Sequence, residues 1–456
     1  MCDAFRNFAC KSLLISALEQ GPAKAMSKTS NVPAKVAAER RPNLLRRFFQ
    51  MLGPGVVTGA ADDDPSGIAT YSIAGAQLGT SLLWTALLTW PLMSMVQMMC
   101  ARVGMVTGRG LAGALQHKFD RRLVLVAAFC LLGANTINIG ADLAGMADAA
   151  EMLTGFNSHF FVVAFGIAIS CATIWLRYHQ IANTLKWLCL VLFSYVITAF
   201  IVHPNWPAAL HDTFAPSWPK GHVAWQTLVA ILGTTISPYL FFWQASQEVA
   251  EEKAKGRRML RERRGATKRE IISRKMDVGI GAFFAVLIMY FIMLTTASTL
   301  HQHGTTEIET SRQAAEVLGP LAGRFAAMIY TLGILGVGFL AIPTLSGSAA
   351  YALCETLKWK EGLDEKLKSA RAFYAIIIAS TAAGIALDFA KINPVKALFW
   401  TAVINGLLAP FLLVGLLILA SDKKIMGGQP SSILSRVLVG ATALIMFGAA
   451  FGMFVL

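Results

Sequence analysis

Long apolar runs, separated by short polar segments, recur along almost the whole chain of 456 residues. A helix needs about 20 consecutive apolar residues to cross a bilayer, and the sequence offers eleven runs near that length. They lie at residues 51–79, 81–104, 123–152, 156–176, 181–202, 223–249, 277–299, 323–353, 372–388, 395–420 and 435–456. The pattern predicts an all-α integral membrane protein with eleven transmembrane spans.

Composition and charge agree with a membrane protein. Charged residues make up 14% of the chain, whereas a soluble domain carries about 25%. The formal net charge of +14 could suggest a nucleic-acid partner, but most Lys and Arg residues lie in every second connecting segment. This asymmetry follows the positive-inside rule. It predicts a cytosolic N-terminus, an extracytoplasmic C-terminus, contact with the lipid bilayer and no nucleic-acid partner.

The chain reads as one membrane domain with a polar extension. Residues 1–48 are expected to form a disordered, basic cytosolic arm, and residues 49–456 the transmembrane domain. The seven cysteines form no CxxC pair, so no disulfide framework is expected. The sequence contains no nucleophile elbow, phosphate-binding loop or HExxH motif, so enzyme activity is not expected and no cofactor is implied.

Two apolar spans are interrupted by proline. The first reads GPGVVTGAADDDPSGIATY (53–71) and the second TTISPYLFF (234–242). Proline breaks a helix and frees backbone carbonyls, and a charged residue inside a membrane span is usually functional. The spans group as five, five and one, with a break in the first span of each five. This predicts inverted repeats at about 49–203 and 222–420, an extra helix at 435–456, and a midplane cation site of a secondary transporter.

The residues at the breaks have two possible roles. Asp64 could bind the cation, or it could cap the half-helix that begins at Pro65, because Asp is a good N-cap. The hydroxyl of Ser237 and the carbonyl of Thr234 could line the site, or serine could donate back to the freed helix carbonyls. Asp62 and Asp63 are one position apart, so they cannot both face the site. They could bind or attract the ion, they could meet solvent in a vestibule, or one of them could be protonated. Backbone oxygens of Ser66 or Gly67 could also ligate.

Two further rows of residues could line a pathway. Asn135, Asn138 and Asp142 form a polar stripe on one face of the third span, either as a lining or as interhelical hydrogen-bonding groups. Ser237, Phe241, Gln244 and Glu248 share a face of the sixth span. That face predicts a path toward the cytosol with Glu248 at its mouth, or simply a solvated helix end.

These motifs carry a family resemblance. GPGVVTGAADDDPSG resembles the first helix of the NRAMP divalent-metal transporters, whose motif there is Asp-Pro-Gly-Asn, and TTISPY resembles their Ala-x-x-Met-Pro-His. NIGADLAGMADAAEML in the third span and LASDKKIMG after the tenth are also similar, and the resemblance covers about residues 45–430 in order. It implies a LeuT-like fold, a 5+5 inverted repeat with broken helices 1 and 6, and transport by alternating access.

The departures from the family motif concern the metal ligands. Asp64 is kept, but Gly67 stands where the family has a metal-binding Asn, and Ser237 where it has the metal-binding Met. Thr234 replaces an Ala whose carbonyl binds, and Thr401 falls near a Gln that approaches the metal. Losing a soft thioether favours hard cations, and a wider site would admit Mg²⁺ with some of its waters. The NRAMP-related magnesium transporters carry changes of this kind.

The proton-carrying positions of the family are also altered. Asp142 keeps a carboxylate of the third span, but Gly145 replaces a Glu, and Tyr239 and Gln244 replace two histidines of the sixth. Histidine and carboxylate chains are the usual proton relays, so coupling to protons is expected to be weak or absent.

The sequence therefore favours a carrier of divalent cations in the inner (cell) membrane, with Mg²⁺ or Mn²⁺ as substrate and Asp64 and Ser237 as metal ligands. A sodium- or proton-linked carrier of a small non-metal solute and a non-transporting membrane sensor stay as alternatives. A monomer would suffice for any of these functions.

Overall fold

The computed structural model describes residues 62–175, 190–390 and 393–456. Within these ranges the regular elements are all helices, as the apolar pattern predicts. The N-terminal arm, the start of the first span and the start of the fifth lie outside the described residues.

Five helices follow the first five predicted spans. They are α4 (Pro65–Leu78), α5 (Trp84–Thr107), α7 (Arg121–Thr154), α8 (Ser158–Trp175) and α10 (Phe193–Val202). The helix α4 begins directly after Asp64, with proline at its first position. Proline is favoured there because its missing N–H would have no helical partner.

The remaining spans form the second five and the extra helix. They are α12 (His222–Thr235), α13 (Pro238–Ala254), α15 (Lys268–Thr299), α18 (Ala326–Leu357), α19 (Arg371–Asp388), α20 (Pro394–Ser421) and α21 (Ile433–Val455). The sixth span is broken between α12 and α13, where Ile236 and Ser237 leave the helical conformation. Both breaks therefore fall at the predicted prolines.

Short helices occupy the connecting segments. They are α6 (Leu111–Leu115), η1 (Leu190–Leu192), α11 (Trp206–Phe214), α14 (Leu260–Arg263), η2 (His301–His303), α16 (Ser311–Glu316), α17 (Gly319–Ala322) and η3 (Gly323–Phe325). The basic segment that connects the spans predicted at 223–249 and 277–299 is shorter than those bounds imply. A capping box between Thr267 and Glu270 starts α15 at Lys268, well before the apolar run.

Eight helical segments in the described part of the chain are long and apolar enough to cross a membrane. The other three spans are accounted for by shorter or more polar helices: α4 is the second half of a broken span, α10 is the described part of the fifth, and α5 fills the second. The arrangement agrees with eleven spans. The bounds of the two repeats stay a prediction.

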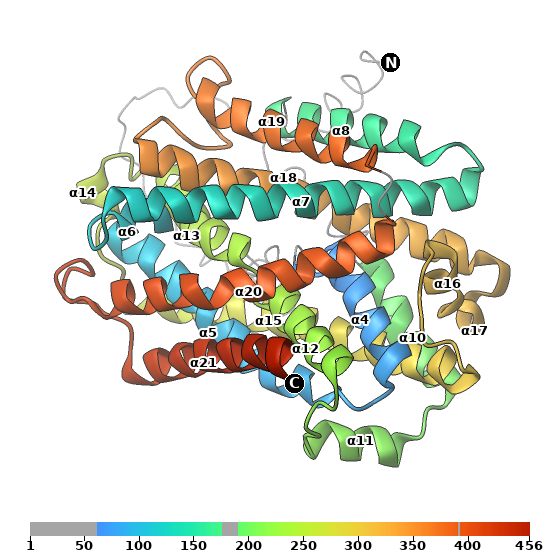
Figure 1. The fold of residues 1–456 in the computed structure, drawn as a ribbon. Coiled ribbons are helices and arrows are strands. Elements are labelled where there is room, and N and C mark those ends of the chain that lie inside the picture. The colour runs from blue at the N-terminus through green and yellow to red at the C-terminus, as the bar shows by residue number, and fades with distance from the viewer. Residues whose placement is uncertain (1–61, 176–189, 391–392) are drawn as a thin grey trace, which may run out of the picture. The chain divides into compact units, whose positions relative to one another are not determined.

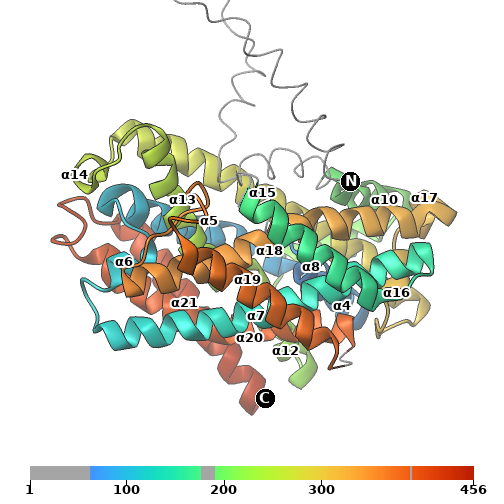
Figure 2. The same ribbon diagram turned by 90° about the horizontal axis from the view of Figure 1, so that it is seen from above.

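The long helices pack in two groups (Figures 1 and 2). In one, α7 contacts α8, α18 and α19. In the other, α4 packs on α15 and α12, while α5 packs on α13 and α15. The helix α20 contacts α4, α7 and α12, so it joins the two groups. The break before α4 therefore lies where both groups meet.

Candidate cation site at the helix breaks

Asp64 caps α4 through its side chain. Its Oδ1 accepts a hydrogen bond of 2.7 Å from the backbone N–H of Gly67, which satisfies one of the donors that a helix start leaves unpaired. The side chain is only 2% exposed. The capping role considered from the sequence is therefore present in the structure, and the carboxylate is held rigidly at the break.

The second oxygen of Asp64 faces α7. The amide nitrogen of Asn138 donates to Oδ2 of Asp64 at 3.0 Å. Asp142 follows one turn later on the same face of α7 and is fully buried. Its carboxyl interacts electrostatically with Asp64, and the backbone N–H of Ser66 approaches it. No described residue donates a hydrogen bond of good geometry to either of its oxygens.

The first residue of the polar stripe has a different role. The amide of Asn135 donates to the carbonyl of Leu345 at 2.8 Å and to the hydroxyl of Ser348 at 2.9 Å. Asn135 thus joins α7 to α18, which is the interhelical role considered for this stripe. Asn138 and Asp142, in contrast, are directed to the break.

Ser66 and Thr401 lie together where α4 meets α20. Their hydroxyl oxygens are 3.2 Å apart, and both hydroxyls donate to the backbone carbonyl of Leu398, at 2.8 Å and 2.7 Å respectively. The structure therefore brings Thr401 next to the first break, where the family resemblance placed it.

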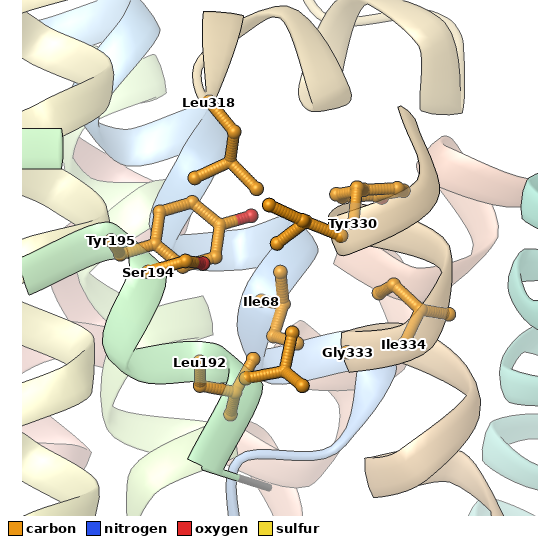
Figure 3. Close-up of a pocket in the computed structure, with 10 residues that line it drawn as sticks. Ile68, Leu192, Ser194, Tyr195, Leu318, Tyr330, Gly333 and Ile334 are labelled. Atoms are coloured by element: carbon orange, nitrogen blue, oxygen red, sulfur yellow. The ribbon is translucent and has the colours of Figure 1, made fainter. Parts of the chain in front are cut away.

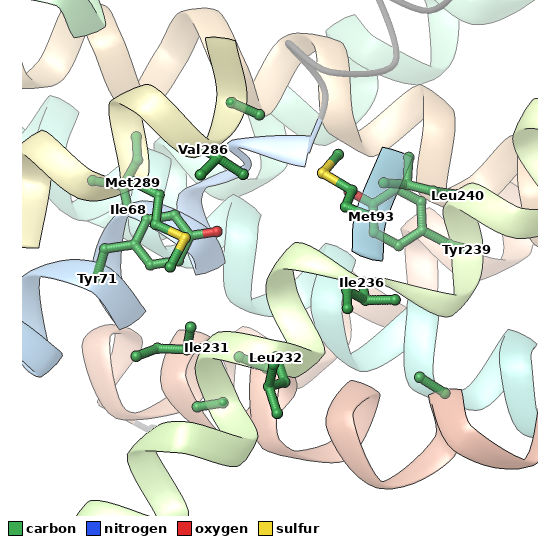
Figure 4. Packing of buried hydrophobic residues seen from close by; sticks show 14 of the residues in the cluster. Ile68, Tyr71, Met93, Ile231, Leu232, Ile236, Tyr239, Leu240, Val286 and Met289 are labelled. Carbon is green, nitrogen blue, oxygen red and sulfur yellow. The ribbon is translucent and has the colours of Figure 1, made fainter. Parts of the chain in front are cut away.

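The two breaks are neighbours. A Cβ atom on Gly67 would lie 3.3 Å from Oγ1 of Thr234, so the start of α4 faces the end of α12 at close range. One residue further along α12, Oγ1 of Thr235 lies 3.1 Å from the hydroxyl oxygen of Tyr71 and 3.7 Å from the sulfur of Met289. Figure 4 shows the packing of Tyr71 and Met289 beside α12.

The hydroxyl of Ser237 is directed back into its own span. It donates to the carbonyl of Gly233 at 3.0 Å and to that of Thr234 at 2.5 Å. This is the back-bonding alternative that the sequence left open. The carbonyl of Thr234, expected as a free ligand, already accepts this hydrogen bond, so the ligand roles of Ser237 and Thr234 stay a prediction.

Tyr239 stands at the start of α13 and is fully buried. Among charged groups, Asp64 acts most strongly on its hydroxyl, followed by Asp62 and Asp142. Figure 4 shows Tyr239 near Met93 of α5. A tyrosine hydroxyl, in place of the family histidine, therefore faces the acidic break.

Asp62 and Asp63 do not meet solvent. Their exposed fractions are 0% and 3%, so the expectation of a solvated vestibule is wrong in this conformation. Neither oxygen of Asp62 has a hydrogen-bond partner among the described residues, and the same holds for Oδ1 of Asp63.

The side chains of this region are acidic and have no basic partner among the described residues. Four carboxyls are buried here, those of Asp62, Asp63, Asp64 and Asp142. The groups that act on them are other acids, amides and backbone N–H groups, and no Lys or Arg side chain of the described residues is among them. Uncompensated negative charge inside a membrane protein is costly. A cation is the natural partner for it.

The expected cytosolic mouth is closed by an ion pair. Glu248 is 2% exposed and accepts from Nε2 of Gln244 at 2.7 Å. Its Oε1 lies 2.7 Å from Nε of Arg274 in α15, which also contacts Glu251 at 2.5 Å and Asp277 at 2.6 Å. Glu248 is therefore neither a solvated helix end nor an open mouth in this conformation.

Sequence reasoning missed the role of Arg274, which it placed in a basic loop. The signal was present in the capping box of Thr267 and Glu270, since a helix that starts at Lys268 places Arg274 one turn before the buried Asp277. The partner across the interface, Glu248, had no such local signal.

A separate hollow lies between α10, α18 and the start of α4 (Figure 3). Its lining includes Ser194, Tyr195 and Tyr330 but no acidic or basic side chain, and the remaining residues are Ile68, Val191, Leu192, Leu318, Ile329, Gly333 and Ile334. It offers no charge to a cation, so the candidate site stays at the breaks.

Among the described residues, no three His, Cys, Asp or Glu side chains converge as a ready metal cage. A cation at the breaks would therefore combine a small number of carboxylates with amide, hydroxyl or carbonyl oxygens. Hard cations such as Mg²⁺ and Ca²⁺ take such mixed oxygen ligands.

Known proteins resemble this chain over most of its length. The chain is 26% identical over 424 residues to the divalent metal cation transporter MntH of Caldanaerobacter subterraneus subsp. tengcongensis, covering 89% of this chain and 93% of that protein. It is 27% identical to the transporter of the same name from Erwinia tasmaniensis, covering 71% and 75%.

Solved structures share the fold. A manganese transporter of Eremococcus coleocola, in complex with an aromatic bis-isothiourea compound, superimposes with a TM-score of 0.69 at 17% identity, covering 94% of this chain and 91% of that one. The nucleobase-cation-symport-1 family transporter Mhp1, in a closed conformation, gives 0.55 at 14% identity, covering 87% and 92%. The expected LeuT-like fold with broken helices 1 and 6 is confirmed.

A family model decides the relationship. The model of the Nramp family, described as natural resistance-associated macrophage protein-like, matches residues 55–456, which is nearly the whole membrane domain. The resemblance read from the two broken spans is thereby confirmed: this chain is a member of the Nramp family.

Proposed function

We propose that this chain carries divalent cations across the membrane by alternating access, and that it favours hard ions, Mg²⁺ or Mn²⁺, over soft transition metals. The observation that carries the proposal is the group of four buried carboxyls at the first break, for which the described part of the chain supplies no basic partner. The relatives named above are divalent metal cation transporters, which supports the same substrate class.

The preference for hard ions rests on the chemistry of the two breaks. Ser237 supplies a hydroxyl where a thioether would bind soft metals, and Gly67 supplies no side chain. Asp64 accepts hydrogen bonds from the backbone N–H of Gly67 and the amide of Asn138, and it interacts electrostatically with Asp142 and Tyr239. Oxygen ligands suit Mg²⁺ and Mn²⁺.

Uptake would be driven by the membrane potential. An inside-negative potential favours entry of a divalent cation by about 4.6 kcal/mol per 100 mV, so no proton is strictly needed. Gly145 also leaves no room for the missing carboxylate, because even a Cβ atom there would lie 2.9 Å from Cδ1 of Leu398. With tyrosine and glutamine at the two former histidine positions, the proposal is transport without obligatory proton coupling.

The proposed setting is the inner membrane, with the N-terminus in the cytosol and the C-terminus outside. The site is formed within one chain, so the proposal requires no second copy. Asp64 neutralises and orients the ion, Ser66, Gly67, Thr234, Ser237 and Thr401 lie around it, and the ion pair of Glu248 with Arg274 closes the cytosolic side.

The test is flux into proteoliposomes with a potassium diffusion potential. Mn²⁺ and Mg²⁺ uptake, each followed with an indicator dye inside the vesicles, should rise with inside-negative potential in the natural protein and fall to background in Asp64→Asn. A pH-sensitive dye should report no matching proton influx.

Asp148→Asn is the matched control. Asp148 lies near the C-terminal end of α7, and its carboxylate accepts a hydrogen bond from the backbone N–H of Ser311. Normal flux in Asp64→Asn would refute the site, and metal-dependent proton influx would refute uncoupled transport. Absence of flux for any divalent ion in the natural protein would favour a non-metal solute.

A further inference from the structure

The amide nitrogen of Asn138 makes a hydrogen bond, whereas its amide oxygen does not receive one from the described residues. Its amide nitrogen donates to Oδ2 of Asp64 at 3.0 Å, which fixes the orientation of the amide group. Its Oδ1 is buried and accepts no hydrogen bond from the described residues. A buried acceptor that receives no hydrogen bond loses its hydration without replacement, so this oxygen calls for a positively charged or hydrogen-bonding partner at the break.

Asp142 also has buried oxygens without a hydrogen-bond donor of good geometry among the described residues. It lies four residues after Asn138, on the same face of α7, and is 0% exposed. The backbone N–H of Ser66 approaches it, but no described residue donates a hydrogen bond of good geometry to either of its oxygens, and Asp64 is the charged group that acts on it. Two neighbouring buried carboxylates repel when both are ionised, and a divalent ion between them would replace this repulsion by attraction to both.

At the second break, in the sixth span, the polar groups expected as ligands are hydrogen-bonded within their own span. The hydroxyl of Ser237 and the carbonyl of Thr234 are bonded to each other at 2.5 Å. If the Thr234 carbonyl oxygen ligated an ion, it would have to accept this hydrogen bond and bind the ion at the same time. Besides Asp62 and Asp63, which precede Asp64 in the chain, the open acceptors at this break are therefore those of Asn138 and Asp142 on α7.

We propose that Asp142 is a metal ligand, and that the carboxylates of Asp64 and Asp142 together with Oδ1 of Asn138 bind the transported cation at the seam between α4 and α7. This inference rests on the proposed function and names the ligands within it. It assigns to the third span a direct role in binding, in addition to the broken spans. The set is all oxygen, which gives the preference for hard ions a structural cause.

The proposal has a consequence for ion size. Mg²⁺ demands ligand distances near 2.0–2.1 Å, whereas Ca²⁺ accepts 2.3–2.6 Å. Asp142→Glu keeps the carboxylate but moves it by one methylene group, so it should change the ratio of Mg²⁺ to Ca²⁺ affinity. A purely structural Asp142 would leave this ratio unchanged.

The experiment is equilibrium binding to the purified full chain. Binding of Mn²⁺ is read from the loss of the free-ion electron paramagnetic resonance signal, and Mg²⁺ and Ca²⁺ are measured by competition. Outer-sphere partners of a metal already contribute about 10–100-fold in affinity. We expect Asp142→Asn to weaken Mn²⁺ and Mg²⁺ binding at least that much, Asn138→Ala to weaken it less, and Asp148→Asn to bind as the natural protein does.

The outcomes separate this inference from the proposed function. One outcome would overturn only the role of Asp142. In that outcome, Asp64→Asn loses cation binding, whereas both Asp142 variants bind as the natural protein does and keep its ratio of Mg²⁺ to Ca²⁺ affinity. The proposed transport function would then stand. Natural binding in Asp64→Asn as well would overturn both. If Asp142→Asn does not yield a monodisperse protein, the ion ratio of Asp142→Glu decides alone.

Discussion

Asn138 of α7 donates a hydrogen bond of 3.0 Å to the carboxylate of Asp64, the residue at the break of the first span. This bond joins a helix of one packing group to the broken helix of the other. A cation bound beside it would touch both groups at once. Because alternating access moves one group against the other around a fixed site, the ion would be held where that motion is centred.

Replacing Ser237 by methionine should restore binding of soft metals. The thioether would stand next to the first break, and soft ligands select soft ions. We expect Cd²⁺ to compete better against Mn²⁺ in Ser237→Met than in the natural protein, as measured by competition binding. Ser237→Leu is the matched control, because it fills a similar volume without sulfur and also removes the hydroxyl bond to Thr234. Equal Cd²⁺ competition in both variants would contradict the selectivity argument.

Arg274 should stabilise the packing of α15 against α13. It is the shared partner of Glu248, Glu251 and Asp277, and it is only 10% exposed. Removing one partner of a buried ion pair costs about 3–5 kcal/mol, so Arg274→Gln should lower the apparent melting temperature clearly in a thermal unfolding assay.

The control for Arg274 is Arg257→Gln. Arg257 also contacts two acids, Glu252 and Glu270, but its side chain is 37% exposed. Exposed ion pairs contribute little, so this variant should unfold near the natural temperature. A similar loss in both variants would show that burial of the Arg274 network does not matter.

Glu361, in the segment after α18, should make stability depend on pH. Burial, and then the charge of Glu355, raise the pKa of Glu361 to about 8, from a usual value of 4.5. The folded chain then keeps a proton that the unfolded chain releases above pH 4.5. Stability from this group is therefore full below pH 4.5 and falls as the pH rises toward 8. Glu361→Gln should gain melting temperature over the natural protein progressively across that range.

Glu365, in the same segment, provides a control of opposite sign. Its side chain lies 2.9 Å from Lys360, and hydrogen bonding to Lys360 lowers the pKa of its carboxyl. Its contribution to stability is present above the ordinary pKa and is lost as the pH falls through the lowered value. Glu365→Gln should therefore lose a little stability near neutral pH. Parallel pH profiles for the two variants would contradict these assignments.

The breaks could be predicted because each depends on a local signal. Pro65 and Pro238 begin the half-helices after them, because proline disfavours a continuous helix. Proline alone does not decide, since Pro91, Pro343 and Pro410 stand inside α5, α18 and α20. Asp64 as a cap was an equally local signal. The positive-inside pattern and the eleven runs followed from the positions of basic and apolar residues along the chain.

The contacts of the site depended on how helices rotate against one another. The sequence placed Asn138 and Asp142 on one face of a span, but whether that face met the break or another helix depends on packing, and Asn135 on the same stripe met α18 instead. The burial of Asp62 and the pairing of Glu248 with Arg274 are likewise set by tertiary contacts. No local pattern encodes them.

The most direct test of the account is calorimetric titration of the purified chain with Mg²⁺, Mn²⁺ and Cd²⁺, comparing the natural protein with Asp64→Asn. The account predicts saturable Mg²⁺ and Mn²⁺ binding that disappears in the variant, with Cd²⁺ binding no more tightly than Mn²⁺. Mg²⁺ and Mn²⁺ binding that survives in Asp64→Asn would contradict the placement of a cation site at the first helix break.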